Sequence, residues 1–209
     1  MMKFAIYDID YTVISTNSLF DVVLFLFRKK PFKMIYIPFL ILVSIMGILR
    51  IISLETLKSY WLILFTGMSK EELSDFSKIF FEIKIIPKIK KGAVENIEQN
   101  RQEGRKIMFV TASFEFYIKP LADYLNVDYF IGTKAFFKNN RLKPKLDGKN
   151  CKGKEKIDRI LNVISKDEID RENSLAYSDS WSDLPFLELS GTFHKIKPSE
   201  WFFEKIIKK

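Results

Sequence analysis

Short apolar runs that end in polar residues alternate with longer helical patterns along this 209-residue chain. Five of these runs have the length of buried strands: residues 3–8, 106–110, 127–131, 174–178 and 192–196. A hairpin is predicted over residues 134–146, with its turn at Asn139 and Asn140. Strands that alternate with helices in this way predict an α/β fold with a Rossmann-like parallel sheet.

Helical patterns fill the segments between these strands. The longest covers residues 18 to 85 and is very apolar. Within it, Ser69 and Glu72 form a capping box that opens a helix through about Phe81. Ser113 is the expected cap of a later helix. The further predicted helices span residues 92–103, 114–124, 153–164 and the segment after residue 196.

The long apolar region separates the first strand from all the others. We therefore predict a core made of residues 1–15 and 86–209, with an all-helical cap of residues 16–85 inserted into it. Apolar residues make up 47% of the chain, which is enough for a buried core and excludes a disordered protein.

The net charge indicates which binding partners are favoured, and the cysteine content and the N-terminal sequence indicate the cellular compartment. The formal net charge of +8 favours phosphorylated metabolites, anionic lipid head groups or nucleic acid, although a lysine-rich surface can also serve solubility alone. The single cysteine, Cys151, excludes an internal disulfide framework. The first strand begins at once, without a signal-peptide pattern, so a cytoplasmic location is expected.

Asp8 and Asp10 follow the first strand and carry the most informative chemistry in the chain. Alternation along a strand directs both side chains to one face. One carboxylate can attack phosphorus and hold a hard cation, while the other transfers the proton of the leaving oxygen. Taken alone, the pair has a plain structural alternative, because aspartates after a strand often cap helices or satisfy turns.

Thr111 and Asp179 also stand where predicted strands end. Ligands of open parallel sheets bind beyond the carboxyl ends of the strands, so both residues are expected to share a site with Asp8. A threonine hydroxyl and the N–H groups that follow it can cradle a phosphate. Asp179 and Asp183 offer oxygen ligands that suit magnesium better than zinc.

Three lysines compete to neutralise the charge of a bound phosphate. Lys152, Lys154 and Lys156 all lie near the start of the helix predicted over residues 153–164. Because the chain contains 34 Lys and Arg residues, most of its lysines serve only the surface. The residues alone leave the choice among the three open.

The order of these segments along the chain resembles the order of the motifs in the haloacid dehalogenase-like (HAD) hydrolases. The motif Asp-x-Asp-x-Thr at residues 8–12 is followed by an apolar strand ending in Thr111, then by a lysine, then by Asp179 and Asp183. The later motifs are similar to those of the subgroup that contains phosphoserine phosphatase. The long apolar insert resembles that of the phosphatidylglycerophosphatase C-type proteins in this subgroup.

The resemblance implies a magnesium-dependent phosphatase that works through an aspartyl-phosphate. Asp8 would be the nucleophile, and Asp10 the general acid and then the general base. The subgroup pattern Gly-x-x-Lys, followed by an apolar residue, favours Lys156 as the phosphate lysine. The implied site residues are Asp8 and Asp10 for catalysis, Thr111, Ala112 and Lys156 for phosphate, and Asp8, Asp10 and Asp179 for Mg²⁺, with Asp183 in support.

Four residues depart from the subgroup or stand outside its pattern. Tyr11 replaces a glycine and is expected to crowd the entrance to the site. Asn17 stands where phosphoserine phosphatases carry a glutamate for the substrate amine, and a neutral amide pairs poorly with an ammonium, so phosphoserine is a disfavoured substrate. His194, the one histidine, is expected to be structural, and Cys151 has no assigned role.

Residues 34–49 form a run of 16 residues without a charge, flanked by Arg28, Lys29, Lys30, Lys33 and Arg50. A spanning helix needs about 20 apolar residues. A single crossing would put Asp8 and Thr111 on opposite sides of the bilayer, and a second crossing would carry Glu55 and Lys58 into it. Two interpretations remain: a buried bundle in the cap, or a segment lying in the interface of an anionic membrane, which the unbroken apolar run favours.

The function predicted from these residues is hydrolysis of a phosphate monoester. The substrate is either a lipid phosphate at the inner face of the membrane or a small soluble phosphate. A catalytically silent, membrane-docked protein of the same fold is the alternative, and retention of the reactive residues argues against it. No aromatic-basic platform or basic helix supports nucleic-acid binding. The sequence fixes neither the substrate nor the oligomeric state.

Overall fold

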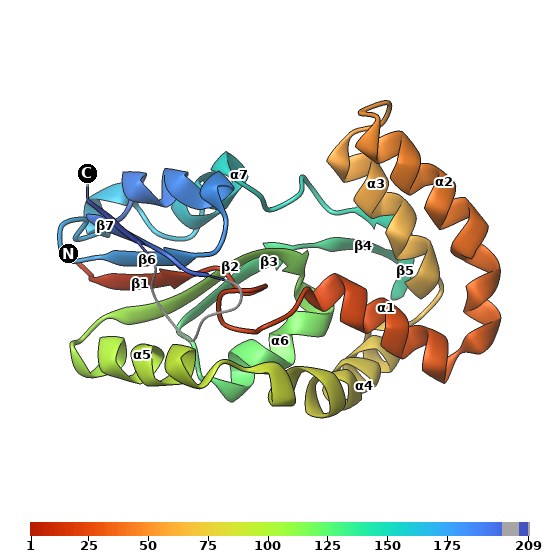
Figure 1. The fold of residues 1–209 in the computed structure, drawn as a ribbon, viewed down its shortest axis with the longest axis horizontal. Coiled ribbons are helices and arrows are strands. Elements are labelled where there is room, and N and C mark those ends of the chain that lie inside the picture. The colour runs from red at the N-terminus through yellow and green to blue at the C-terminus, as the bar shows by residue number, and fades with distance from the viewer. Residues whose placement is uncertain (198–204, 209) are drawn as a thin grey trace.

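Six strands form one sheet with β1 near its middle, in the order β3-β2-β1-β6-β7-β8 (Figure 1). The structure, a computed structural model, describes residues 1–197 and 205–208. The strand bounds are β1 (Phe4–Tyr7), β2 (Lys106–Phe114), β3 (Tyr129–Thr133), β6 (Leu175–Ser178), β7 (Thr192–Lys195) and β8 (Lys205–Lys208). The first five are parallel to their neighbours, and β8 runs antiparallel to β7. The predicted α/β fold with a parallel sheet is confirmed.

Strand β1 is buried on both faces because helices cover both sides of the sheet. Phe4 and Ile6 pack into one apolar cluster, while Ala5 and Tyr7 pack into the other. This arrangement explains why the strand is a continuous apolar run and not an alternating one. Helices α5 (Lys91–Gln102) and α6 (Glu115–Tyr124) lie on one side, and α7 (Lys154–Leu161) and η6 (Trp181–Glu188) on the other (Figure 1).

The chain between β1 and α5 is mostly helical, with short turns and loops between the helices, as predicted. Its elements are α1 (Ser18–Lys29), η1 (Pro31–Tyr36), α2 (Ile37–Ile48), α3 (Leu54–Trp61), η2 (Leu62–Phe65), α4 (Lys70–Phe80), η3 (Phe81–Ile85) and η4 (Ile86–Lys88). Both reciprocal bonds of the predicted capping box at Ser69 and Glu72 are present. Helix α2 lies at the outer edge of the molecule, with α3 between it and the rest (Figure 1).

A hairpin of β4 (Ala135–Lys138) and β5 (Arg141–Leu146) completes the fold, together with the short helix η5 (Lys166–Glu168). The predicted turn is correct, since Asn139 and Asn140 have φ values of 51° and 60°. Asparagine tolerates this left-handed conformation better than most residues. Strand β5 packs against α3 and η2, so the hairpin contacts and supports the inserted helices.

Three expectations about the elements are wrong. Strand β2 continues past Thr111 to Phe114, and Ser113 does not cap α6, because its hydroxyl bonds to Asp10 instead. The segment Lys205–Lys208 of the predicted terminal helix is a strand, because its backbone pairs with the free edge of β7. Residues 198–204 lie outside the described part of the chain.

Candidate active site

The carboxyl ends of β1, β2 and β6 bring three of the predicted segments to one edge of the sheet. Tyr7 is in register with Phe109 on one side and with Tyr177 on the other. The residues that follow these positions therefore meet in space, as the strand-end argument predicts. Asp8 is the first of them, and its N–H donates to the Tyr177 carbonyl at 2.9 Å.

Lys156 is the lysine that reaches this edge. Its Nζ donates to Asp8 Oδ1 and to Asp183 Oδ2, both at 2.7 Å, and its side chain is only 2% exposed. Burial alone would lower the pKa of Lys156, but the carboxylates of Asp8 and Asp183 outweigh burial and raise it. Lys152 and Lys154 are exposed. The ammonium that faces the nucleophile candidate is therefore that of Lys156.

Burial and the Lys156 ammonium shift the pKa of the Asp8 carboxyl in opposite directions. The residue is 7% exposed, and burial raises its pKa to about 7, while the Lys156 ammonium opposes the shift. The carboxylate of Asp183 adds to the increase. The ion pair with Lys156 favours the carboxylate form of Asp8, which nucleophilic attack requires.

Asp10 is held by groups from two other segments. Oδ1 accepts the Ser18 N–H at 3.1 Å, and Oδ2 accepts the Ser113 hydroxyl at 2.9 Å. The Ser18 hydroxyl in turn lies 2.9 Å from the Ser113 hydroxyl. Burial raises the pKa of Asp10, and the bonds from Ser18 and Ser113 oppose the rise. A carboxyl with a raised pKa suits proton donation to a leaving oxygen.

Thr111 and Ala112 lie beside this pair on β2. Thr111 is buried, and its Oγ1 accepts the N–H of Ser113 at 3.1 Å, which leaves the hydroxyl hydrogen free to donate. The Ala112 carbonyl accepts from the Thr133 hydroxyl at 2.6 Å and from Lys58 Nζ. These contacts fix the backbone on which a phosphate would rest.

Asp179 and Asp183 follow β6 and have different surroundings. The Asp179 N–H donates to Thr12 Oγ1 at 2.9 Å, which ties the two acidic motifs together. Burial raises the pKa of the half-buried Asp179 carboxyl, and Lys195 opposes the rise. Asp183 is buried, and its Oδ2 also accepts the Ser178 hydroxyl at 2.7 Å. Asp183 thus positions Lys156.

Two residues of the site were not predicted. Lys58 of α3 donates to the Ala112 carbonyl and, at 2.6 Å, to Asn150 Oδ1. Asn150 also accepts from the Thr133 hydroxyl at 3.1 Å. Burial lowers the pKa of Lys58 to about 8, although the Asp10 carboxylate opposes this. Asn150 begins the segment of residues 150–156 that resembles the subgroup, but nothing in the sequence assigns it a role, and Lys58 lies outside the motifs.

Tyr11, Asn17 and Cys151, which depart from the subgroup or stand outside its pattern, each have distinct surroundings. Tyr11 adopts a φ of 57°, the left-handed region in which glycine is usual, and its side chain is 36% exposed. The Asn17 side chain caps α1 by accepting the Phe20 N–H at 3.2 Å. Cys151 is buried, and burial raises the pKa of its thiol to about 11, which keeps it protonated.

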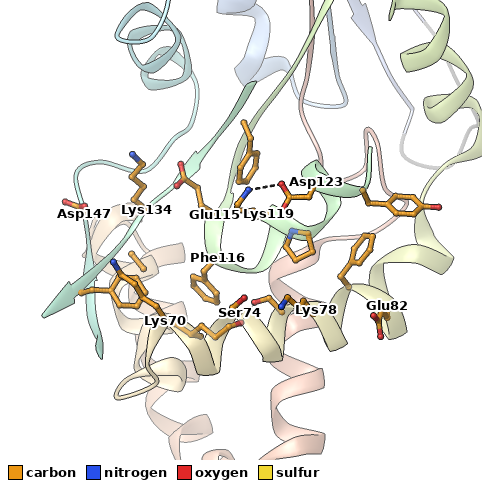
Figure 2. Close-up of a pocket in the computed structure, with 18 residues that line it drawn as sticks. Lys70, Ser74, Lys78, Glu82, Glu115, Phe116, Lys119, Asp123, Lys134 and Asp147 are labelled. Carbon is orange, nitrogen blue, oxygen red and sulfur yellow. Dashed lines mark hydrogen bonds and ion pairs between the residues drawn. The ribbon is translucent and has the colours of Figure 1, made fainter. Parts of the chain in front are cut away.

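Two cavities lie outside the cluster of aspartates. One, of about 720 Å³, lies between α4 and α6, and charges of both signs surround an apolar floor that includes Phe116 (Figure 2). It contains none of the predicted site residues. The other, of about 380 Å³, opens between the start of α3 and the loop before α7, lined by Leu54, Glu55, Lys149, Asn150, Lys152 and Glu155. Through Asn150 and Lys58, this second cavity adjoins the site.

The fold and the site define a class of hydrolase, and comparison with known families agrees. The chain belongs to the haloacid dehalogenase-like hydrolases, whose family model matches residues 5–188. Phosphoserine phosphatase from Archaeoglobus fulgidus is 27% identical over 104 residues, which cover 50% of this chain and 30% of that protein. Protein CicA from Caulobacter vibrioides is 34% identical over 91 residues, which cover 43% and 40%. The matched segments thus span less than half of these relatives.

Solved structures share the fold over most of the chain. A protein of unknown function from Bordetella pertussis Tohama I has a TM-score of 0.78 and 23% identity, covering 90% of this chain and 86% of its own. A phosphoserine phosphatase with a phospho-aspartyl intermediate analogue has a TM-score of 0.62 and 16% identity, covering 93% and 86%. At these identities the likeness establishes the fold.

The acidic residues fit the Mg²⁺ that this family implies. Asp8, Asp10, Asp179 and Asp183 supply carboxylate oxygens at this edge of the sheet, where the ammonium groups of Lys156, Lys58 and Lys195 act on them. Asp183 Oδ1 is a buried oxygen without a hydrogen-bond partner among the described residues. Carboxylate oxygens are the donors that Mg²⁺ prefers. Within the described residues no three such side chains already converge as a preformed metal site, and Lys156 lies between Asp8 and Asp183.

Proposed function

We propose that this protein is a phosphatase that hydrolyses phosphate monoesters through an aspartyl-phosphate on Asp8. One observation carries the proposal: a buried carboxylate at the end of β1 pairs with Lys156, and a second carboxylate, Asp10, follows two residues later. Membership of the HAD-like hydrolases and relatives named phosphoserine phosphatase support it.

The reaction has two steps. In the first, the oxygen of Asp8 that is not bonded to Lys156 attacks phosphorus, the bond to the substrate oxygen breaks, and Asp10 gives that oxygen its proton. In the second, Asp10 takes a proton from water, whose oxygen attacks the same phosphorus. The bond between phosphorus and Asp8 then breaks, inorganic phosphate leaves, and the carboxylate of Asp8 is restored.

The phosphate group is held by donors from two segments. The Thr111 hydroxyl and the Ala112 N–H would bind its oxygens, and the Lys156 ammonium would neutralise part of its charge. Asp183 and Ser178 keep Lys156 in place through the Asp183 carboxylate. A lysine fixed in this way needs no reorganisation as charge develops on the phosphate.

Asp8, Asp10 and Asp179 would hold Mg²⁺, with Asp183 in support. The bound ion would neutralise charge on the phosphate oxygens.

The proposed substrate is a lipid phosphate at the cytoplasmic face of a membrane, with a small soluble phosphate as the alternative. The exposed apolar side chains of α2 favour the lipid. Phosphoserine is disfavoured, because Asn17 is a neutral residue whose carbonyl oxygen caps α1. A screen of lysophosphatidic acid, phosphatidylglycerophosphate and soluble sugar and amino-acid phosphates separates these classes.

The purified Asp8→Asn variant tests the mechanism. The amide is close in shape to the carboxylate but is not a nucleophile, so phosphate release should disappear while the far-ultraviolet circular dichroism stays unchanged. Wild type quenched in acid during turnover should carry acid-stable phosphate, and Asp8→Asn should carry none. Equal steady-state rates for the two proteins would exclude covalent catalysis by Asp8. A folded wild type that hydrolyses none of the phosphates would favour a catalytically silent protein.

A further inference from the structure

The outer face of η1 and α2 exposes large apolar side chains. We call it the exposed apolar face, and its principal members are Phe32, Ile35, Ile41, Leu42, Ile45 and Ile48. Ile35 and Ile48 are each 79% exposed, and Phe32 is 68% exposed. Only Leu40 and Val43 of α2 are buried. This is far more exposed apolar surface than scattered single residues on a soluble protein explain.

The charge around this face has one sign. No Asp or Glu occurs from residue 22 to residue 54, a stretch that carries Arg28, Lys29, Lys30, Lys33 and Arg50. Pairing of the face with a second copy would therefore bring cations toward cations, which opposes association. A surface of lipid phosphates supplies both the apolar layer and the missing negative charge.

The geometry indicates a helix that lies along a membrane. Residues 31–48 are apolar and long enough to pass as a membrane-spanning candidate, and 17% of them are buried. Leu40 and Val43, however, are anchored in the apolar core of the molecule, and the Phe39 ring contacts the Tyr60 ring of α3 at 5.5 Å. A helix attached to the rest of the molecule along one side can place only its other side in lipid.

We propose that the exposed apolar face docks on an anionic bilayer, with its apolar side chains among the acyl chains and its basic residues on the lipid phosphates. Leu54, which is 52% exposed, follows this face in the chain and lines the second cavity together with Lys149 and Lys152. Docking would therefore bring the mouth beside the active site close to lipid head groups. This last point, unlike the docking itself, rests on the proposed phosphatase function.

Vesicle co-sedimentation tests the docking without any measurement of activity. Wild type should sediment with vesicles of phosphatidylcholine and phosphatidylglycerol, bind weakly to phosphatidylcholine alone, and be released in part by salt. The Leu42→Ser/Ile45→Ser variant should lose most of the binding. The Arg28→Gln/Lys29→Gln variant should bind anionic vesicles roughly fivefold more weakly for each charge removed.

The matched control is Leu161→Ser/Val163→Ser, which changes two exposed apolar residues at the end of α7 and just beyond it. It should bind vesicles like wild type. All variants should keep the circular dichroism and soluble-phosphate hydrolysis of wild type. Vesicle binding by a wild type without phosphatase activity would uphold the docking and reject the proposed function.

Three results would overturn the docking. The first is a wild-type protein that stays in the supernatant when anionic vesicles are sedimented. The second is a control variant that loses as much vesicle binding as Leu42→Ser/Ile45→Ser. The third is a wild-type dimer in analytical ultracentrifugation that Leu42→Ser/Ile45→Ser converts to a monomer, without vesicle binding by either protein. That result would assign the face to a second copy of the chain.

Discussion

Lys156 shares one ammonium between two buried carboxylates, so its removal leaves both without their cation. Lys156→Met should reduce the free energy of unfolding by about 3–5 kcal/mol, the usual cost of breaking a buried ion pair. Urea unfolding at neutral pH measures it, and Lys152→Met, at an exposed lysine, is the control. A Lys156→Met protein as stable as the control would show that the carboxylates do not depend on this ammonium.

His194 gives the stability of the protein a dependence on pH. Its ring stacks on Tyr177 at 4.7 Å, and burial, with a smaller contribution from Arg105, lowers the pKa of His194 to about 4. The unfolded chain therefore binds the proton more readily below about pH 6.5. The resulting loss of stability should develop as the pH falls from 6.5 toward 4.

His194→Phe keeps an aromatic ring on Tyr177 and removes the titrating group. The difference in unfolding free energy between pH 7 and pH 5 should be smaller in this variant than in wild type. The comparison is direct because the chain has one histidine. Identical pH dependence in the two proteins would mean that other groups account for the acid sensitivity.

At the scale of residues, the sequence could predict motif residues but not their partners. Asp8 and Asp179 follow apolar strands, Thr111 lies near the carboxyl end of β2, and parallel strands bring their carboxyl ends together. The contacts of Lys58 and Asn150 depend on how a helix packs against a loop, 92 positions away in the chain. Among the three candidate lysines the residues alone leave the choice open, the subgroup pattern favours Lys156, and Lys156 is the one whose ammonium bonds to Asp8.

At the scale of elements, α3 is tied to the end of β2 through one side chain. Lys58 donates to the Ala112 carbonyl and to Asn150, and hydrogen bonds from a charged group contribute roughly 1.5–3 kcal/mol each. Lys58→Met should therefore speed amide hydrogen exchange in α3 while β1 exchanges as in wild type. Lys70→Met, at the start of α4, is the control. Unchanged exchange in α3 would show that apolar packing alone holds this helix.

The elements themselves were predicted best where local signals are strong. The capping box of α4 and the Asn139–Asn140 turn depend on neighbours in the chain, and both are present. The extension of β2 to Phe114 and the strand Lys205–Lys208 depend on pairing with distant strands. Pairing of that kind overrides local preference, and no short window of sequence contains it.

At the scale of the whole molecule, the proposed Mg²⁺ site would make the stability of the protein respond to Mg²⁺. An ion that binds only the folded state stabilises it by about 2.7 kcal/mol at a concentration 100-fold above Kd. The Tm should therefore rise with MgCl₂ and return to its starting value with EDTA, independently of any substrate. Asp179→Asn should require more Mg²⁺ for the same increase, because one oxygen donor with a charge is lost.

Ionic strength must be separated from specific binding in this experiment, because the chain carries a net charge of +8 and salt screens its repulsion. KCl at matched ionic strength should produce only a small change in Tm. Asp158→Asn alters an exposed carboxylate on α7 and should respond to Mg²⁺ like wild type. An equal increase with KCl, or an Asp179→Asn titration that overlays that of Asp158→Asn, would exclude Asp179 from a magnesium site.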